Sequence, residues 1–212
     1  GIRDLTVTGV RRVLFRSGKL RSPATVNRYL AALSHVFTIA EKEWEWVQTN
    51  PIRKVRKQKE SRGRVRFLDE TERGALLAAT KKSKNRHLYP IVVLALSTGM
   101  RLGEITGLKW GNVDLADGRI IIDETKNGER RAVPLVGFAL QVMKDHTKVR
   151  RVDWDFIFSS DQKNQPVDIR KAWNNAIKQA GIEDFRFHDL RHSAASYLAM
   201  NGASLAEIAD VL

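Results

Sequence analysis

The chain has 212 residues, enough for one full domain with a sizeable apolar core and part of another. Its 37 Lys and Arg residues outnumber its 24 Asp and Glu residues, and the resulting net charge of +13 predicts a polyanionic partner. The absence of cysteine excludes disulfides and Cys-based zinc sites. Because neither a signal peptide nor an apolar run of roughly 18 residues is present, we expect a cytoplasmic protein without membrane contact.

The first 17 residues fit no element. Residues 1–17 have no sustained helical or strand period and no helix caps. We therefore interpret them as a non-native or disordered leader and exclude them from the fold, with a genuine basic N-terminal arm as the alternative.

The first predicted element is an amphipathic helix over residues 23–47. Ser22 suits the N-cap and Pro23 the first helical position, while Asn50 and Pro51 mark the end. Because a lone helix cannot bury its apolar face, we expect part of that face to be exposed or docked on the next domain. The apolar positions at helical spacing are Val26, Leu30, Leu33, Phe37 and Ile39, and the residues expected to be exposed or docked are Val36, Phe37 and Trp44.

Residues 53–66 are the most basic stretch. Eight of these 14 residues are Lys or Arg, and Glu60 is the only acid. Such a run repels itself, so we predict an interdomain linker that follows nucleic-acid phosphates, with a plain solvated linker as the alternative. The candidate binding residues in it are Arg53, Lys54, Arg56, Lys57, Lys59, Arg62 and Arg64.

Two helices are predicted after the basic run. Asp69 and Glu72 form a capping-box pair ahead of a helix that reaches about Thr80. Residues 89–97 are apolar on all sides, which is typical of a central buried helix, and Gly99 predicts its end.

A hairpin is predicted over residues 118–134, where two strands flank an Asn-Gly turn. Lys126 lies beside that turn, and a lysine in such a place is by itself normally a solvent-facing residue. Arg130 and Arg131 on the returning strand are expected to contact phosphate or solvent rather than to take part in chemistry.

Further helices are predicted over residues 140–146 and 168–180, with a short buried segment over 156–160 between them. A capping box of Ser204 and Glu207 indicates a last helix. Three histidines have no partner at a useful spacing and are expected at the surface or the core edge, namely His35, His87 and His146.

The helix that begins at Asp189 has a polar head. Its apolar positions recur at helical spacing, which puts His188 and Arg191 about one turn apart at the start of the helix. Unpaired N–H groups and the positive end of the helix dipole, together with an imidazole and a guanidinium, suit a phosphate. A polar first turn that is merely solvated is the alternative.

Residues 95–110 contain a second arginine, Arg101, directly after the predicted buried helix, followed by Glu104. This segment, the lysine beside the hairpin turn and the later H-x-x-R pair resemble, in type and order, the tyrosine recombinase (phage integrase) family over roughly residues 22–212. The resemblance implies an α+β fold that is mainly helical with a small antiparallel β-hairpin or sheet.

The resemblance also implies a domain organisation. Residues 18–52 are expected to be the end of a helical core-binding domain, residues 53–66 a linker and residues 67–212 a catalytic domain. The implied partner is double-stranded DNA, bound by a homo-oligomer, a tetramer in this family, without cofactor or metal.

In such recombinases a DNA strand is cut and rejoined through a 3′-phosphotyrosyl intermediate. The resemblance assigns Arg101 and Arg191 as clamps on the scissile phosphate and Lys126 as the acid that protonates the departing 5′-oxygen. His188 would assist proton transfer at the tyrosine, and Glu104 would hold either Arg101 or His188 by a charge-assisted hydrogen bond.

The chain departs from the family pattern at its end. That pattern places a second His or Trp, and then the nucleophilic tyrosine, beyond Leu212. Tyr197 follows Arg191 on the apolar face of the same helix, so we interpret it as a core residue and expect this chain to bind DNA without cleaving it. A non-enzymatic DNA-binding module is the alternative, and a metal-dependent nuclease is disfavoured because the sequence offers no acidic cluster for two metal ions.

Overall fold

The structure is a computed structural model that describes residues 15–16, 19–61, 63–122, 130–148, 154–160 and 164–211. It divides into two compact units, with the boundary between Arg64 and Val65. Strand β1 (Phe15–Arg16) pairs antiparallel with β2 (Lys19–Leu20), and the rest of the predicted leader lies outside the described residues. Within the described residues, no helix has both the length and the apolarity to cross a membrane.

The first unit is built on helix α2 (Pro23–Lys42). Ser22 caps it as predicted, because its hydroxyl accepts a hydrogen bond from the N–H of Thr25. Val36 is 52% exposed and Phe37 is half-buried, so the expected partial exposure of the apolar face is confirmed.

The helix ends earlier than predicted. The N–H of Trp46 bonds back to the carbonyl of Ala40 across Glu45, whose φ of 54° lies in the left-handed region. This closure ends α2 at Lys42, so the prediction that the helix continues to residue 47 is wrong. Trp44, which follows the helix, is 47% exposed, and its ring lies 4.5 Å from that of Trp46.

Two asparagines hold the chain that follows α2 against that helix. Buried Asn50 caps the short 3₁₀ helix η1 (Pro51–Lys54) and donates from Nδ2 to the carbonyl of Ser34 at 2.8 Å. Asn27 donates to the carbonyl of Gln58 at 2.8 Å and accepts from its N–H at 2.9 Å. The first part of the basic run is therefore fixed to α2.

The second unit begins with helix α3 (Glu70–Lys81), and its predicted capping box is confirmed. Asp69 accepts from the N–H of Glu72 at 2.8 Å, and the Glu72 carboxylate accepts from the N–H of Asp69 at 3.2 Å. Helix α4 (Leu88–Thr98) follows and ends at Gly99, which has a φ of 63°.

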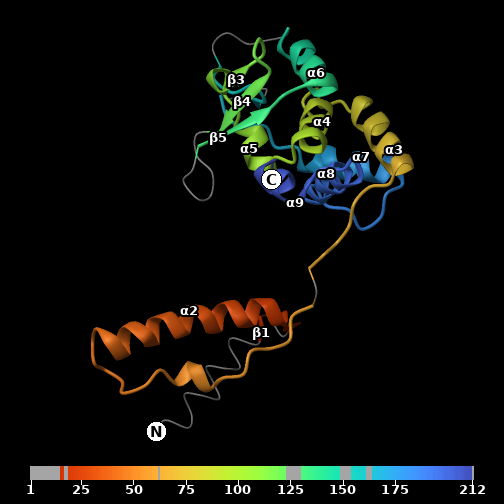
Figure 1. Ribbon diagram of the computed structural model, residues 1–212. Helices are drawn as coiled ribbons and strands as arrows, with labels where there is room; N and C mark the ends of the chain where they lie inside the picture. Colours follow the sequence, from red (N-terminus) through yellow and green to blue (C-terminus); the bar gives the residue numbers. More distant parts are fainter. Residues whose placement is uncertain are drawn as a thin grey trace. The chain divides into compact units, whose positions relative to one another are not determined.

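The predicted central helix is confirmed, because most residues of α4 are buried and the helix contacts α3, α5, α6 and α8. Figure 1 shows α4 among these helices, while α3 also packs against α7. The other helices of the second unit are α5 (Leu102–Thr106), α6 (Gly137–Thr147), α7 (Arg170–Ala180), α8 (Asp189–Met200) and α9 (Leu205–Val211).

A three-stranded antiparallel sheet lies beside these helices, in the order β3 (Val113–Asp114), β4 (Arg119–Ile122) and β5 (Arg131–Pro134). Strands β4 and β5 confirm the two predicted strands. The sequence did not indicate β3, which has only two residues and follows the 3₁₀ helix η2 (Trp110–Asn112). The fold is thus mainly helical with a small antiparallel sheet, as expected.

Candidate functional site

Arg101 occupies the N-cap position of α5, two residues after the glycine that ends α4. Its backbone N–H bonds to one carboxylate oxygen of Glu104 at 2.9 Å, and its Nη1 bonds to the other at 2.8 Å. The Arg101 side chain is 43% exposed, whereas that of Glu104 is 10% exposed. A largely but not fully buried carboxylate therefore holds a guanidinium that still reaches solvent.

A second arginine reaches the same carboxylate from the sheet. Nη2 of Arg131, the first residue of β5, lies 2.9 Å from Oε2 of Glu104. Burial opposes ionisation of this carboxyl group, but the hydrogen bonds from Arg101 and the charge of Arg131 hold the pKa of Glu104 below its usual value. The ionised carboxylate of Glu104 therefore links the start of α5 to strand β5.

Arg191 joins the cluster from α8. Its Nη1 donates to the carbonyl of Gly99 at 2.6 Å, although 92 positions separate the two residues. Burial and the nearby charges of Arg101 and Arg131 place the pKa of Arg191 below its ordinary value, with the carboxylate of Glu104 acting in the opposite direction. Arg101 and Arg191 are thus close enough for the charge of one to affect the other.

His188 precedes the first residue of α8 and is exposed. Its ring centroid lies 5.6 Å from that of His192, edge to face. His188 and Arg191 therefore lie at the start of one helix, where Arg191 reaches Gly99, two residues before Arg101. Lys126 lies outside the described residues.

The basic residues of the 53–66 run are mostly exposed. Arg53 pairs with Glu41 at 3.1 Å, and Arg64 is half-buried. Arg130, on the sheet side, is exposed, and Arg62 lies outside the described residues. The exposed members of the run are Arg53, Lys54, Arg56, Lys57 and Lys59.

Tyr197 of α8 is half-buried. Its hydroxyl donates to the carbonyl of Leu68 at 2.9 Å, and the guanidinium carbon of Arg73 lies 5.1 Å from its ring centroid. Burial raises the pKa of Tyr197, so its neutral form is favoured.

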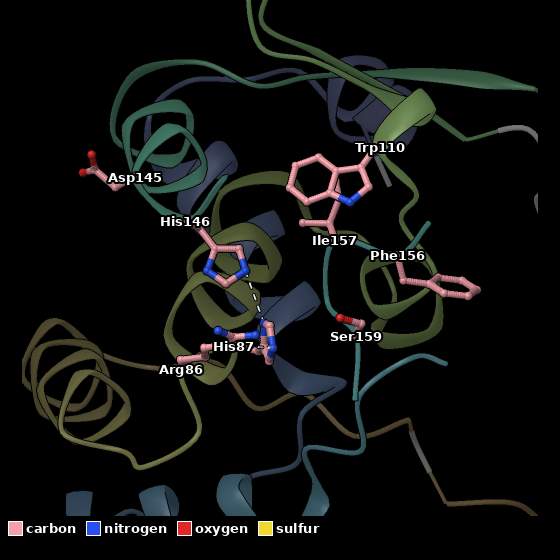
Figure 2. A pocket seen from close by; sticks show the side chains of 8 residues that line it. All are labelled: Arg86, His87, Trp110, Asp145, His146, Phe156, Ile157 and Ser159. Atoms are coloured by element: carbon pink, nitrogen blue, oxygen red, sulfur yellow. Dashed lines mark hydrogen bonds between the residues drawn. The ribbon is translucent and has the colours of Figure 1, made fainter. Parts of the chain in front are cut away.

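A separate cavity of 170 Å³ lies at the other end of α4, where His87 is the N-cap residue. Figure 2 shows His146 of α6 turned toward His87, with a hydrogen bond of 3.2 Å between the rings, while the carboxylate of Asp145 points away. The two histidines were expected at the surface or the core edge, but His87 is buried, while His146 is half-buried. They are 59 positions apart, so no local spacing indicated the pair.

The surroundings set the direction of this hydrogen bond. Arg86 donates from Nε to Nε2 of His87, so that nitrogen must accept and Nδ1 of His87 must donate to His146. His146 in turn donates to the backbone carbonyl of Ile157. Burial together with the charge of Arg86 lowers the pKa of His146, which favours the neutral form of its ring.

The model of the "Phage integrase family" matches residues 66–212, which is more than half of the sequence. The chain belongs to the phage integrase family. It is 40% identical over 200 residues to the shufflon-specific DNA recombinase of Escherichia coli, covering 92% of this chain and 49% of that protein. It is 32% identical to the integrase of Salmonella phage P22, covering 89% of this chain and 50% of that protein. This family member thus spans about half the length of the curated relatives it matches.

Solved structures show the same fold. The Tn1549 transposon integrase, in complex with circular intermediate DNA, superimposes with a TM-score of 0.72 at 19% identity, over 90% of this chain and 71% of the other. A lambda integrase dimer bound to a core site gives a TM-score of 0.69 at 20% identity, over 95% and 83% of the two chains. The resemblance and fold class inferred from the sequence are therefore confirmed.

Proposed function

We propose that this integrase family member carries the phosphate-binding centre of a site-specific DNA recombinase, which cleaves and rejoins strands through a 3′-phosphotyrosyl intermediate. The proposal depends on one observation. Arg101 and Arg191, far apart in the sequence, lie close together at the Gly99 end of α4. Names of the relatives, a DNA recombinase and an integrase, support it.

The chemistry needs positive charge at the non-bridging oxygens of the scissile phosphate. Arg101 and Arg191 are the proposed ligands of those oxygens, because two fixed guanidiniums stabilise the negative charge that grows there in the transition state. Glu104 is the residue that orients Arg101.

The remaining steps move protons. A tyrosine oxygen bonds to phosphorus while the bond from phosphorus to the 5′-oxygen breaks, and Lys126 is the proposed donor of a proton to that leaving oxygen. His188, exposed at the head of α8, is proposed to assist the proton transfer at the tyrosine. Rejoining is the reverse of this step.

The tyrosine itself is proposed to come from polypeptide outside these 212 residues, in a longer chain or in another subunit. Tyr197 donates its hydroxyl proton to a backbone carbonyl, and Tyr89 lies in the first turn of α4, at the end opposite Gly99. The third tyrosine, Tyr29, belongs to the first unit.

Double-stranded DNA is the proposed partner, bound by a homo-oligomer such as a tetramer. The net charge of +13 supports a polyanion, and the exposed basic residues of the 53–66 run are proposed phosphate contacts. Residues 18–52 are proposed to be the end of a core-binding domain and residues 67–212 the catalytic domain.

Covalent capture tests the function. A chain extended with the residues encoded downstream is incubated with nicked duplex substrates, and the products are denatured and separated. A protein–DNA adduct that withstands denaturation and chelator is expected, since the proposed chemistry uses no metal. Strand cleavage that needs a divalent cation and leaves no adduct would contradict the proposal.

A further inference from the structure

Glu104 accepts hydrogen bonds from two arginines that belong to different elements. Its Oε1 accepts from Nη1 of Arg101, and its Oε2 accepts both from the N–H of Arg101 and from Nη2 of Arg131. We propose that Arg131 is a positioning residue, which acts through Glu104 to fix the guanidinium of Arg101 for phosphate binding. Because Arg101 is a phosphate ligand only in the proposed recombinase, the inference rests on that function.

Burial explains why Arg131 matters to Glu104. The Glu104 side chain is only 10% exposed, so water cannot readily replace a missing partner. The Arg131 side chain is 20% exposed, which leaves the pair shielded from solvent on both sides. Without Arg131, Oε2 keeps one strong donor, and the carboxylate is freer to turn away from the half-exposed side chain of Arg101.

Charge gives a second reason. An isolated pair of Glu104 and Arg101 is neutral and attracts a phosphodiester weakly. Arg101 and Arg131 both contact the Glu104 carboxylate, and Arg191 lies close enough to feel its charge, so this group of residues keeps an excess of positive charge while Glu104 stays ionised. Arg131 therefore lets Glu104 orient Arg101 without cancelling the attraction for DNA.

Arg131 also stands at the base of the segment that contains Lys126. It is paired across the sheet with Ile122, the last residue of β4, and Lys126 lies between these two residues in the sequence. The contact with Glu104 thus joins that base to the residues that follow α4. The Glu104 carboxylate thus links the sheet to the side chain of Arg101.

The test compares three variants of the 212-residue chain. Arg131→Gln removes the charge, Arg131→Lys keeps it but loses the planar fork, and Arg119→Gln is the matched control. Arg119 lies on β4 of the same sheet, where it pairs with Asp114 and Asp117, so its loss changes the net charge equally and spares Glu104.

Two NMR measurements follow. The ¹³C signal of the Glu104 carboxylate is titrated with acid, and the Nε–H signals of Arg101 and Arg191 are titrated with inorganic phosphate. We expect Arg131→Gln to raise the pKa of Glu104 and to weaken phosphate binding at Arg101 by about tenfold, the equivalent of one charge-assisted hydrogen bond. Arg131→Lys should restore part of both effects, and Arg119→Gln should change neither.

The outcomes separate the inference from the proposed function. If Arg131→Gln lowers thermal stability but leaves the Glu104 titration and the Arg101 signal unchanged, Arg131 is merely structural and the inference is overturned. If phosphate shifts neither arginine in the wild-type chain, the proposed phosphate centre is wrong. The Glu104 titration and the Arg101 signal without phosphate would then still show whether Arg131 positions Arg101.

Discussion

His87 donates a hydrogen bond of 3.2 Å to His146 at the end of α4 opposite the arginine cluster. The bond fits only while the facing nitrogen of His146 carries no proton, because a proton there would face the N–H of His87. The ring of His146 also stacks on Phe158, with 5.2 Å between centroids. A partly buried and proton-sensitive contact thus joins the start of α4 to α6.

We predict that this contact makes the second unit less stable in mild acid. The pKa of His146 in the folded state lies below the ordinary value of 6.5, because burial and the charge of Arg86 disfavour its cation. The contribution of neutral His146 to the free energy of unfolding is therefore fully present above pH 6.5 and is lost as the pH falls from 6.5 toward the lower folded-state pKa. Urea unfolding between pH 7.5 and 5.5 measures this loss.

His146→Gln keeps a donor and an acceptor but cannot titrate in this range. It should cost about 1–3 kcal/mol at pH 7.5, as for an imperfectly satisfied buried group, and should reduce the loss of stability between the two pH values. His35→Gln, at an exposed position on α2, is the control. An equal pH dependence in wild type and His146→Gln would show that His146 does not control it.

Locally encoded features were predictable from the sequence. The capping box of Asp69 and Glu72 and the stop at Gly99 depend on residues a few positions apart, and both occur as expected. The predicted end of α2 was wrong because Glu45 adopts a left-handed conformation, which a sequence normally signals with glycine or asparagine. Helical periodicity by itself cannot reveal such a closure.

Long-range pairs were not predictable from local pattern. The contact of Arg131 with phosphate or solvent stays a prediction, but no local pattern indicated that its guanidinium also contacts Glu104, 27 positions earlier. The pairing of His87 with His146 likewise depends on how α4 and α6 pack. The order of motifs did indicate Arg101 and Arg191 together, because the family resemblance carries tertiary information that spacing does not.

The exposed basic run predicts a salt-dependent affinity for duplex DNA. Each phosphate neutralised contributes roughly −0.9 to the slope of log K against log salt concentration. Replacing Lys54, Arg56 and Lys57 with Ala should flatten that slope by up to about three such increments. Fluorescence anisotropy at several salt concentrations measures it.

Arg53 offers an internal comparison within the run. It already pairs with Glu41 at 3.1 Å, so Arg53→Ala should flatten the slope less than a single replacement of Lys57. An unchanged slope in the triple variant would show that the run is a solvated segment without phosphate contacts.

Tyr197→Phe should affect stability and not chemistry. The variant loses the hydrogen bond from the hydroxyl to the carbonyl of Leu68, which typically costs about 1 kcal/mol of unfolding free energy. In a chain extended downstream, the yield of covalent DNA adduct should match that of the unmodified extended chain. Loss of the adduct in Tyr197→Phe, with folding intact, would instead make Tyr197 the nucleophile.

Arg191→Ala should abolish most strand cleavage while sparing most of the affinity for DNA. Arg191 is one of two guanidiniums proposed to stabilise the transition state, and losing one such group costs on the order of 3 kcal/mol, or at least about a hundredfold in rate. Arg191 is one phosphate contact among several, so its loss should flatten the slope of log K against log salt concentration by only about 0.9, the contribution of one phosphate. Single-turnover adduct formation by the extended chain measures the rate.

Arg191 also donates to the carbonyl of Gly99, so removing the whole side chain perturbs folding as well as phosphate binding. Arg191→Lys separates the two effects, because an ammonium group keeps the charge and one donor but lacks the planar fork that grips two phosphate oxygens. We expect Arg191→Lys to keep near-normal stability and DNA affinity yet remain slow in adduct formation. If Arg191→Lys cleaves at the wild-type rate, a positive charge suffices at this position, and two-point binding of the phosphate by Arg191 is ruled out.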